Sequence, residues 1–143
     1  MQNFNEDLVI RGRFFTLWVD GEEMGEVKTA DTTSELTGEK VPIAGKLGEG
    51  ERITGSTGTG SLTFWKCYNG LNKKINDCIK NHKPFKFDLT GQSNDPELEG
   101  YERVTIQNCI MKKFKPLQGD ITKTLLEESY DFSYNVENVE YEK

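Results

Sequence analysis

The sequence predicts a mainly β fold, either a β-sandwich or an open β-barrel, with six or seven strands and one flanking α-helix. Two observations lead to this prediction. Apolar and polar side chains alternate with the period of a strand in segments along the whole chain, whereas only residues 69–82 repeat their apolar side chains with helical spacing. The 143 residues suit a single domain, 1–143. We expect about twelve N-terminal and about six C-terminal residues to be flexible, or to become ordered on assembly.

The first expected strand is residues 13–20, which is apolar on both faces and ends at the turn pair Asp20 and Gly21. Residues 26–36 form a second strand that is polar on both faces, which indicates a sheet edge or a wall facing water. Residues 37–50 contain four glycines and a proline, which predicts a long loop. Its apolar side chains indicate that it docks onto another surface, and a disordered insertion is the alternative. These side chains are Val41, Ile43 and Leu47.

Residues 51–68 are expected to form a long strand, and the run of small residues within it is the most informative feature of the chain. Thr57, Thr59, Ser61 and Thr63 fall on one face, with Ser56, Gly58, Gly60 and Leu62 on the other. Glycine inside a strand marks a bend or a close approach of another backbone. A strand with small side chains on both faces belongs within a larger sheet or against a neighbouring subunit. A flexible glycine-threonine loop is the alternative.

Residues 69–82 predict the helix, because four apolar residues recur on one stripe. They are Leu71, Ile75, Cys78 and Ile79. Lys73, Lys74, Lys80 and Lys83 form a basic patch, which is either a solvated surface or a docking site for an acidic partner. His82 is expected at the helix end beside the dipole, and Pro84 follows it.

Three more strands complete the expected sheet. In residues 85–89, the side chains of Phe85, Phe87 and Leu89 face inward; in residues 103–113, Val104, Ile106 and Ile110 share one face; and in residues 128–136, Tyr130, Phe132, Tyr134 and Val136 form an apolar face. The acidic tail from residue 138 onward is expected to fray.

Composition narrows the functional classes. A hydrophobic content of 34% is low for a monomer that buries its own sheets, and the formal net charge of −6 argues against a general nucleic-acid binder. The same negative charge is compatible with a protein that lets nucleic acid pass without binding it. No run of 18 apolar residues and no signal-peptide pattern occurs, so we expect no stable membrane association.

The residue types needed for chemistry are sparse, so we expect neither an enzyme nor a cofactor. Three widely spaced cysteines and one histidine do not make a zinc site, and buried thiols in a reducing cytoplasm are the simplest interpretation of the cysteines. Gly58 and Gly60 lie inside a strand and open no helix, which excludes a phosphate loop. Nothing places two of the glutamates across a cleft.

Four segments in matching order and spacing resemble the tail tube proteins of contractile phage tails, including the PBSX type of defective prophage and R-type bacteriocins. Residues 17–27 resemble the opening hairpin of that family, and residues 58–66 resemble its GTG-containing strand. Residues 102–106 resemble its ERVTL-type strand, and residues 125–134 its closing strand. Together the segments span Leu17 to Tyr134. The first dozen residues and the acidic tail are not matched.

The resemblance implies a structural protein. Its subunits close into hexameric rings whose inner strands join into one barrel, and the rings stack into a tube inside a contractile sheath, giving a channel through the target envelope. The implied partners are sheath, baseplate and tail-terminator proteins. In a phage tube, DNA would pass through the lumen without specific binding. Assembly would take place in the bacterial cytoplasm.

The resemblance also implies residue roles. Inner-barrel strands would be residues 26–36 and 53–63, with 103–111 and 130–136 beside them. Their polar face carries Thr29, Asp31, Thr33, Thr57, Thr59, Ser61 and Thr63. Val41, Ile43 and Leu47 would anchor the loop to a neighbouring subunit or ring, and Lys73, Lys74 and Lys80 would meet an acidic sheath surface.

Two alternatives remain open from the sequence. One is a monomeric β-barrel whose rings line a cavity for an apolar ligand; the rings are Phe85, Phe87, Tyr130 and Phe132. The other is the tube component of a type VI secretion system.

Overall fold

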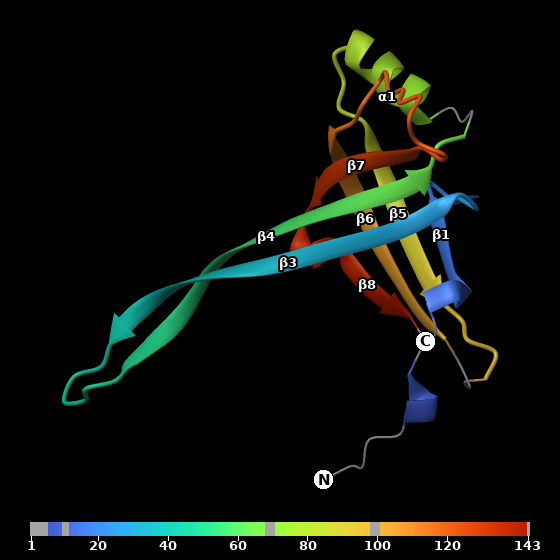
Figure 1. Ribbon diagram of the computed structural model, residues 1–143. Coiled ribbons are helices and arrows are strands. Elements are labelled where there is room, and N and C mark those ends of the chain that lie inside the picture. The colour runs from blue at the N-terminus through green and yellow to red at the C-terminus, as the bar shows by residue number, and fades with distance from the viewer. Residues whose placement is uncertain (1–5, 10–11, 68–70, 98–100, 143) are drawn as a thin grey trace.

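The computed structural model describes residues 6–9, 12–67, 71–97 and 101–142 (Figure 1). The strands are β1 (Phe15–Val19), β2 (Glu22–Glu23), β3 (Val27–Pro42), β4 (Glu49–Trp65), β5 (Lys86–Ser93), β6 (Glu102–Lys113), β7 (Glu127–Tyr134) and β8 (Val139–Glu142), and the α-helix is α1 (Leu71–Lys80). Three single 3₁₀ turns cover Glu6–Leu8, Gly12–Phe14 and Val136–Asn138. The predicted mainly β fold with one flanking helix is confirmed. No helix within the described residues has the length and apolar character needed to cross a membrane.

All eight strands belong to one antiparallel sheet with the order β2-β1-β5-β6-β7-β4-β3. Strand β8 pairs with the first half of β6, on the same side of β6 on which β7 pairs with the second half. The sheet curls around a core without closing, so β3 lies at one end and the short β2 at the other (Figure 1). Helix α1 lies across one end of this body and contributes Leu71 and Ile75 to the core. The fold is therefore an open barrel with two sheet edges rather than a closed one.

The centre of the core consists of aromatic rings in contact. The Phe87 and Phe132 rings meet edge to face at 5.5 Å, and Phe64 lies 5.8 Å from Tyr130. Phe85 packs against Phe87 in turn. The four rings that could have lined a ligand cavity are thus all buried in the core, which removes the main sequence argument for an apolar-ligand binder.

Glycines in β4 make room for two of these rings. Phe132 lies over Gly60 and Tyr134 over Gly58, because these residues are direct partners in the β4–β7 ladder. A Cβ atom built at Gly58 would lie 2.6 Å from Cε2 of Tyr134, and one at Gly60 would lie 2.8 Å from Cε2 of Phe132. A close approach does occur at these glycines, but the atoms that come nearest belong mainly to two aromatic rings rather than to another backbone.

The β1–β2 hairpin follows the expected two-residue turn. Asp20 and Gly21 both have positive φ angles, 53° and 80°, as a tight hairpin turn requires. The Asp20 carboxylate accepts a hydrogen bond of 2.8 Å from the Asp88 amide, and the Asp20 amide donates one of 2.8 Å to the Asp88 carbonyl. These bonds fix the hairpin to β5.

Helix α1 ends in a left-handed cap at His82, whose φ is 56°. The His82 amide donates to the Ile79 carbonyl and the Lys83 amide donates to the Cys78 carbonyl, which is the Schellman pattern. The expected place of His82 at the helix end is confirmed. Of the predicted apolar stripe, Leu71 and Ile75 are buried, Cys78 is half-buried and Ile79 is 53% exposed. Residues 69 and 70 of the predicted helix lie outside the described residues.

Two predictions about strand segments were wrong. Residues 37–50 do not form one long loop, because 37–42 belong to β3, 49 and 50 belong to β4, and only 43–48 form the turn. Gly38 and Gly50 lie in the paired ribbon, whose backbone hydrogen bonds do not need large side chains, and Gly45 and Gly48 lie in the turn. The tail does not fray, since β8 pairs with β6 from Arg103 to Ile106. Of the expected flexible N-terminus, residues 1–5, 10 and 11 lie outside the described residues.

Two predictions about side chains were also wrong. Ile110 does not share a face with Ile106, because an extra residue in β6, at Asn108 with φ of 57°, shifts the register and turns Cys109 inward instead. Of the three cysteines expected to be buried, Cys109 is buried, Cys78 is half-buried and Cys67 is exposed. Cys67 follows the end of β4, where the chain has left the core.

Candidate assembly surfaces

The β3–β4 ribbon extends far beyond the body of the sheet. Pairing between β4 and β7 ends at Gly58 opposite Tyr134, so residues 35–57 pair only with one another within the described chain. We call residues 35–57 the arm. Figure 1 shows it projecting away from the body on the side opposite the β1–β2 hairpin. A two-stranded ribbon is marginally stable alone in water, which favours contact of the arm with another surface.

The arm carries apolar side chains that the chain itself leaves exposed. Leu36 and Ile53, on the face of the ribbon that continues from the core, are 62% and 54% exposed. Near the tip, Val41 and Ile43 are each 43% exposed and Leu47 is fully exposed. The structure thus places the three predicted anchors at the tip of a paired ribbon, where they extend beyond the body.

The seven predicted inner-barrel residues lie together. Thr29, Asp31 and Thr33 of β3 are direct cross-strand partners of Thr63, Ser61 and Thr59, and Thr57 lies opposite Glu35. Directly opposed residues in an antiparallel pair point to the same side, so the seven side chains share one face, which we call the polar wall.

The polar wall continues onto β7. Thr59 lies opposite Ser133, Ser61 opposite Asp131 and Thr63 opposite Ser129. A shallow hollow of about 470 Å³ lies over the wall, and Lys112 of β6 also lines it. The face away from the core is therefore a largely exposed surface of hydroxyl groups and carboxylates over three neighbouring strands.

Both ends of the sheet offer unpaired backbone groups. Within the described residues β3 pairs with β4 along one edge, and its other edge has no strand partner. At the opposite end, β2 pairs only with Trp18 and Val19 of β1. Free edges of this kind pair readily with a strand of another chain.

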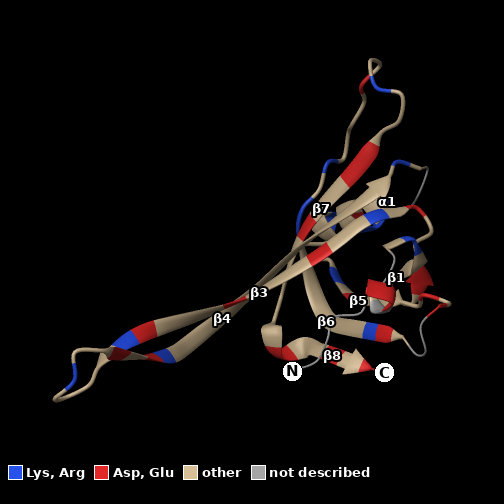
Figure 2. Ribbon diagram, turned by 60° about the horizontal axis from the view of Figure 1, so that its bottom comes forward, with Lys and Arg blue, Asp and Glu red and all other residues tan. Residues whose placement is uncertain are grey.

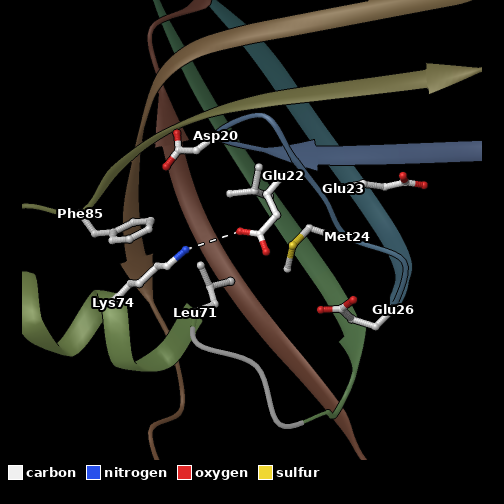
Figure 3. A pocket seen from close by; sticks show the side chains of 9 residues that line it. Asp20, Glu22, Glu23, Met24, Glu26, Leu71, Lys74 and Phe85 are labelled. Carbon is white, nitrogen blue, oxygen red and sulfur yellow. Dashed lines mark ion pairs between the residues drawn. The ribbon is translucent and has the colours of Figure 1, made fainter.

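The predicted basic patch lies on the exposed side of α1. Lys73, Lys74 and Lys80 are all exposed. Figure 3 shows Lys74 pointing across a hollow of about 120 Å³ toward Glu22, with its Nζ 3.6 Å from the carboxylate. Both side chains are more than 60% exposed, so this ion pair contributes little to stability. The patch has acidic neighbours on the β1–β2 hairpin, which the sequence did not indicate (Figures 2 and 3).

A buried polar cluster ties α1 to the sheet, and the sequence analysis missed it. Glu128 is 4% exposed and accepts a 3.0 Å hydrogen bond from Lys66. The Tyr130 hydroxyl lies 2.9 Å from Glu128 Oε2 and 2.7 Å from Asn72 Oδ1. Burial, and then the hydrogen bond to the Glu128 carboxylate, raise the pKa of Tyr130 above its usual range. The signal was available, because Glu128 has the same strand parity as Tyr130 and Phe132.

Comparison with known proteins places these surfaces in a family. The family model described as "Phage tail tube protein" matches residues 2–141. The chain belongs to the phage tail tube protein family. This confirms the resemblance drawn from the sequence, and the expectation of a structural protein rather than an enzyme.

A curated relative agrees with this family. The chain is 31% identical over 126 residues to "Phage-like element PBSX protein XkdM" of Bacillus subtilis (strain 168). That alignment covers 87% of this chain and 86% of the relative. The PBSX type named by the resemblance is therefore also the type of this relative.

Solved structures share the fold at much lower identity. A chain of the anti-feeding prophage cap, the AFP tube terminating cap, has a TM-score of 0.78 at 8% identity and covers 99% of this chain and 96% of its own. A chain of the PVC sheath-tube complex, from an extracellular contractile injection system in the extended state, has a TM-score of 0.70 at 11% identity. The match covers 96% of this chain and 93% of that chain. The fold of this chain is thus shared by proteins with which it has little sequence in common.

Proposed function

We propose that this tail tube family member is the protomer of hexameric rings that stack into the inner tube of a contractile phage tail or of a phage-tail-like bacteriocin particle. The observation that carries the proposal is the open sheet with an unpaired β3 edge and a projecting arm. If the edge strand of one copy pairs with the edge strand of the next, neither edge of the sheet stays unpaired in the ring. A head-to-tail contact of this kind closes a ring when its rotation is correct.

The polar wall suits the inner surface of such a ring. A barrel built from several subunits is wide enough for water, so its inner face needs polar side chains. Asp31 and Asp131 add negative charge to the hydroxyl groups of this face. Like charge keeps phosphates off the surface, so DNA in a phage particle passes along the wall without specific binding.

The arm and helix α1 suit contacts outside the wall. The arm tip would reach a neighbouring subunit or ring, with Val41, Ile43 and Leu47 buried in the contact. Helix α1 would face the sheath, and Lys73 and Lys80 would pair with acidic side chains there. Baseplate and tail-terminator proteins would cap the two ends of the tube, and assembly would take place in the bacterial cytoplasm before the protein joins the tail particle.

Negative-stain electron microscopy of the purified full-length chain over a concentration series tests this proposal. We expect rings with sixfold class averages at low concentration, and hollow tubes of uniform width at higher concentration or on long incubation. Compact monomers at every concentration, both alone and with a purified baseplate added as a nucleus, would overturn it. Rings of another symmetry would overturn the hexamer alone.

The sheath contact is tested separately. Lys73→Glu together with Lys80→Glu should leave tube formation unchanged and weaken co-assembly with the cognate sheath protein. The matched control is Lys86→Glu with Lys113→Glu, which makes the same charge change at exposed residues of β5 and β6 rather than of α1. Equal sheath binding by both double variants would contradict the role of the helix.

A further inference from the structure

The connection between β6 and β7, residues 114–126, exposes more apolar surface than the arm tip does. Leu117 is 92% exposed, Ile121 is fully exposed and Leu125 is 67% exposed. We call this connection the apolar loop. A chain with 34% hydrophobic residues rarely leaves such a group in water unless another surface covers it.

Hydrogen bonds hold the apolar loop in a defined shape. The Asp120 carboxylate accepts bonds of 3.0 Å from the Thr122 amide and 2.6 Å from the Thr122 hydroxyl. At the base, the Gln118 side chain donates a 2.7 Å bond to the Glu127 carbonyl, and Asn72 of α1 donates to the Lys115 carbonyl. The apolar side chains are therefore presented by an ordered turn.

A hollow whose lining mixes apolar side chains with Thr32, Ser34, Ser93 and Glu102 lies at the other end of the sheet. It has a volume of about 420 Å³ and opens between β3 and the strands β1, β5, β6 and β8. We call it the end hollow. Phe15, Ala30, Val104, Val139 and Tyr141 are among the residues that line it. A closed apolar cavity of about 150 Å³ already holds a benzene ring, so the end hollow has room for more than one aliphatic side chain.

Strand β6 joins the two features along one axis. Its first residues, Glu102 and Val104, line the end hollow, and its last residue, Lys113, leads into the apolar loop. The base of the β6–β7 connection contacts α1 through Asn72 and Lys115, and Figure 2 shows the connection projecting beyond α1, with β8 and the C-terminus at the opposite end. A second copy displaced along β6 therefore brings its apolar loop to the end hollow of the first.

We propose that the apolar loop of one copy inserts Leu117 and Ile121 into the end hollow of another copy, and that this contact stacks one ring on the next. The proposal rests on the proposed tube. The charges agree with it, because the loop carries Lys115 and Lys123 against the single carboxylate of Asp120, whereas Glu102 lines the hollow. The contact is heterologous, so it repeats without limit along an axis, as a tube requires.

Cross-linking between two marked copies tests the contact. In a Cys67→Ser, Cys78→Ser background, one protein carries Ile121→Cys and another of different mass carries Tyr141→Cys; Cys109 is buried and stays. The two are mixed, assembled and treated with a short bis-maleimide. We expect a heterodimer band several-fold stronger than that from the control pair Ile79→Cys and Tyr141→Cys, because Ile79 is an exposed aliphatic residue on α1 outside the contact.

Microscopy of the same samples separates the two proposals. If the samples form tubes but the heterodimer band is no stronger than that of the control pair, the loop contact is overturned and the tube proposal stands. No assembly by the wild-type chain under any condition would overturn both. As a second measurement, Ile121→Asp should leave rings but abolish tubes, while Ile79→Asp should keep tubes; normal tubes from Ile121→Asp would overturn the stacking role.

Discussion

The space above Gly60 can be tested by adding a single methyl group. In Gly60→Ala the new Cβ atom would lie 2.8 Å from Cε2 of Phe132 and 2.9 Å from the Asp31 carbonyl oxygen, with Cζ of the ring closer still. The ring is buried and in edge contact with Phe87, so it cannot move without disturbing the core. Overpacking of this kind costs about 1–3 kcal/mol, and the contact with both ring and backbone places Gly60→Ala near the upper end of that range.

The lower chain entropy of alanine in the unfolded state offsets up to about 1 kcal/mol of this cost. We therefore expect a net loss of about 2 kcal/mol in the free energy of unfolding. Urea denaturation followed by fluorescence measures it, and with a slope of about 1–3 kcal/mol per molar urea the midpoint should fall by roughly 1 M.

Gly55→Ala is the matched control, because the same strand contains this glycine with nothing within 4 Å of a built Cβ. It should be neutral or slightly stabilising. In a Phe132→Leu background, the added cost of Gly60→Ala should shrink, because the ring that causes the clash is gone. A Gly60→Ala protein as stable as the wild type would refute the packing argument.

Three further results are expected. Lys66→Met should lower the free energy of unfolding by about 3 kcal/mol, because it leaves the buried Glu128 carboxylate without its cation. The control Lys40→Met should cost less than about 1 kcal/mol, because the ion pair between Lys40 and Glu51 is exposed. Equal losses in the two variants would contradict the role of burial. Burial, followed by the charges of Asp88 and Asp20, raises the pKa of the Cys109 thiol to about 12. Its contribution to stability is therefore complete below the ordinary pKa of 9.0 and is lost as pH rises toward 12. At pH 8 a thiol reagent followed by mass spectrometry should label the exposed Cys67 quickly and Cys109 only on unfolding, and equal labelling rates would count against this environment. Leu47→Asp should keep the wild-type free energy of unfolding, because the side chain is fully exposed, and should reduce assembly seen by electron microscopy; unchanged assembly would remove Leu47 as an anchor.

Strand alternation predicted the faces of the sheet well wherever the pairing was regular. The threonine face from Thr57 to Thr63 and the aromatic face from Tyr130 to Tyr134 both lie as expected, because a period of two fixes the side on which each residue falls. The same period of two predicted that Thr29, Asp31 and Thr33 share one face of their strand and that Thr57 to Thr63 share one face of theirs, whereas their place on an inner barrel was implied by the resemblance.

Irregular pairing was not predictable from the chain alone. The extra residue at Asn108 leaves no signal in composition, yet it reverses the sides on which Cys109, Ile110 and Met111 lie, and a second irregularity follows between Met111 and Lys113. The arm looked like a loop because glycine and proline are frequent in loops, and only the register with the opposite strand shows that residues 38–42 are paired. The apolar loop went unnoticed because exposure of Leu117 and Ile121 depends on how far the turn stands from the body.

The unpaired edge of β3 has a kinetic consequence for a chain that assembles. Sixteen residues of open edge invite pairing with any extended polypeptide, yet charged side chains interrupt this edge at Lys28, Asp31, Glu35, Glu39 and Lys40. Random partners meet unmatched charges there, and two free copies gain too little from one contact to stay together. A finished ring end would instead present a matching edge, the polar wall and the end hollow at once. Polymerisation would then show a lag that preformed ends abolish, and the number of starting ends, rather than the protein concentration, would set how many particles form.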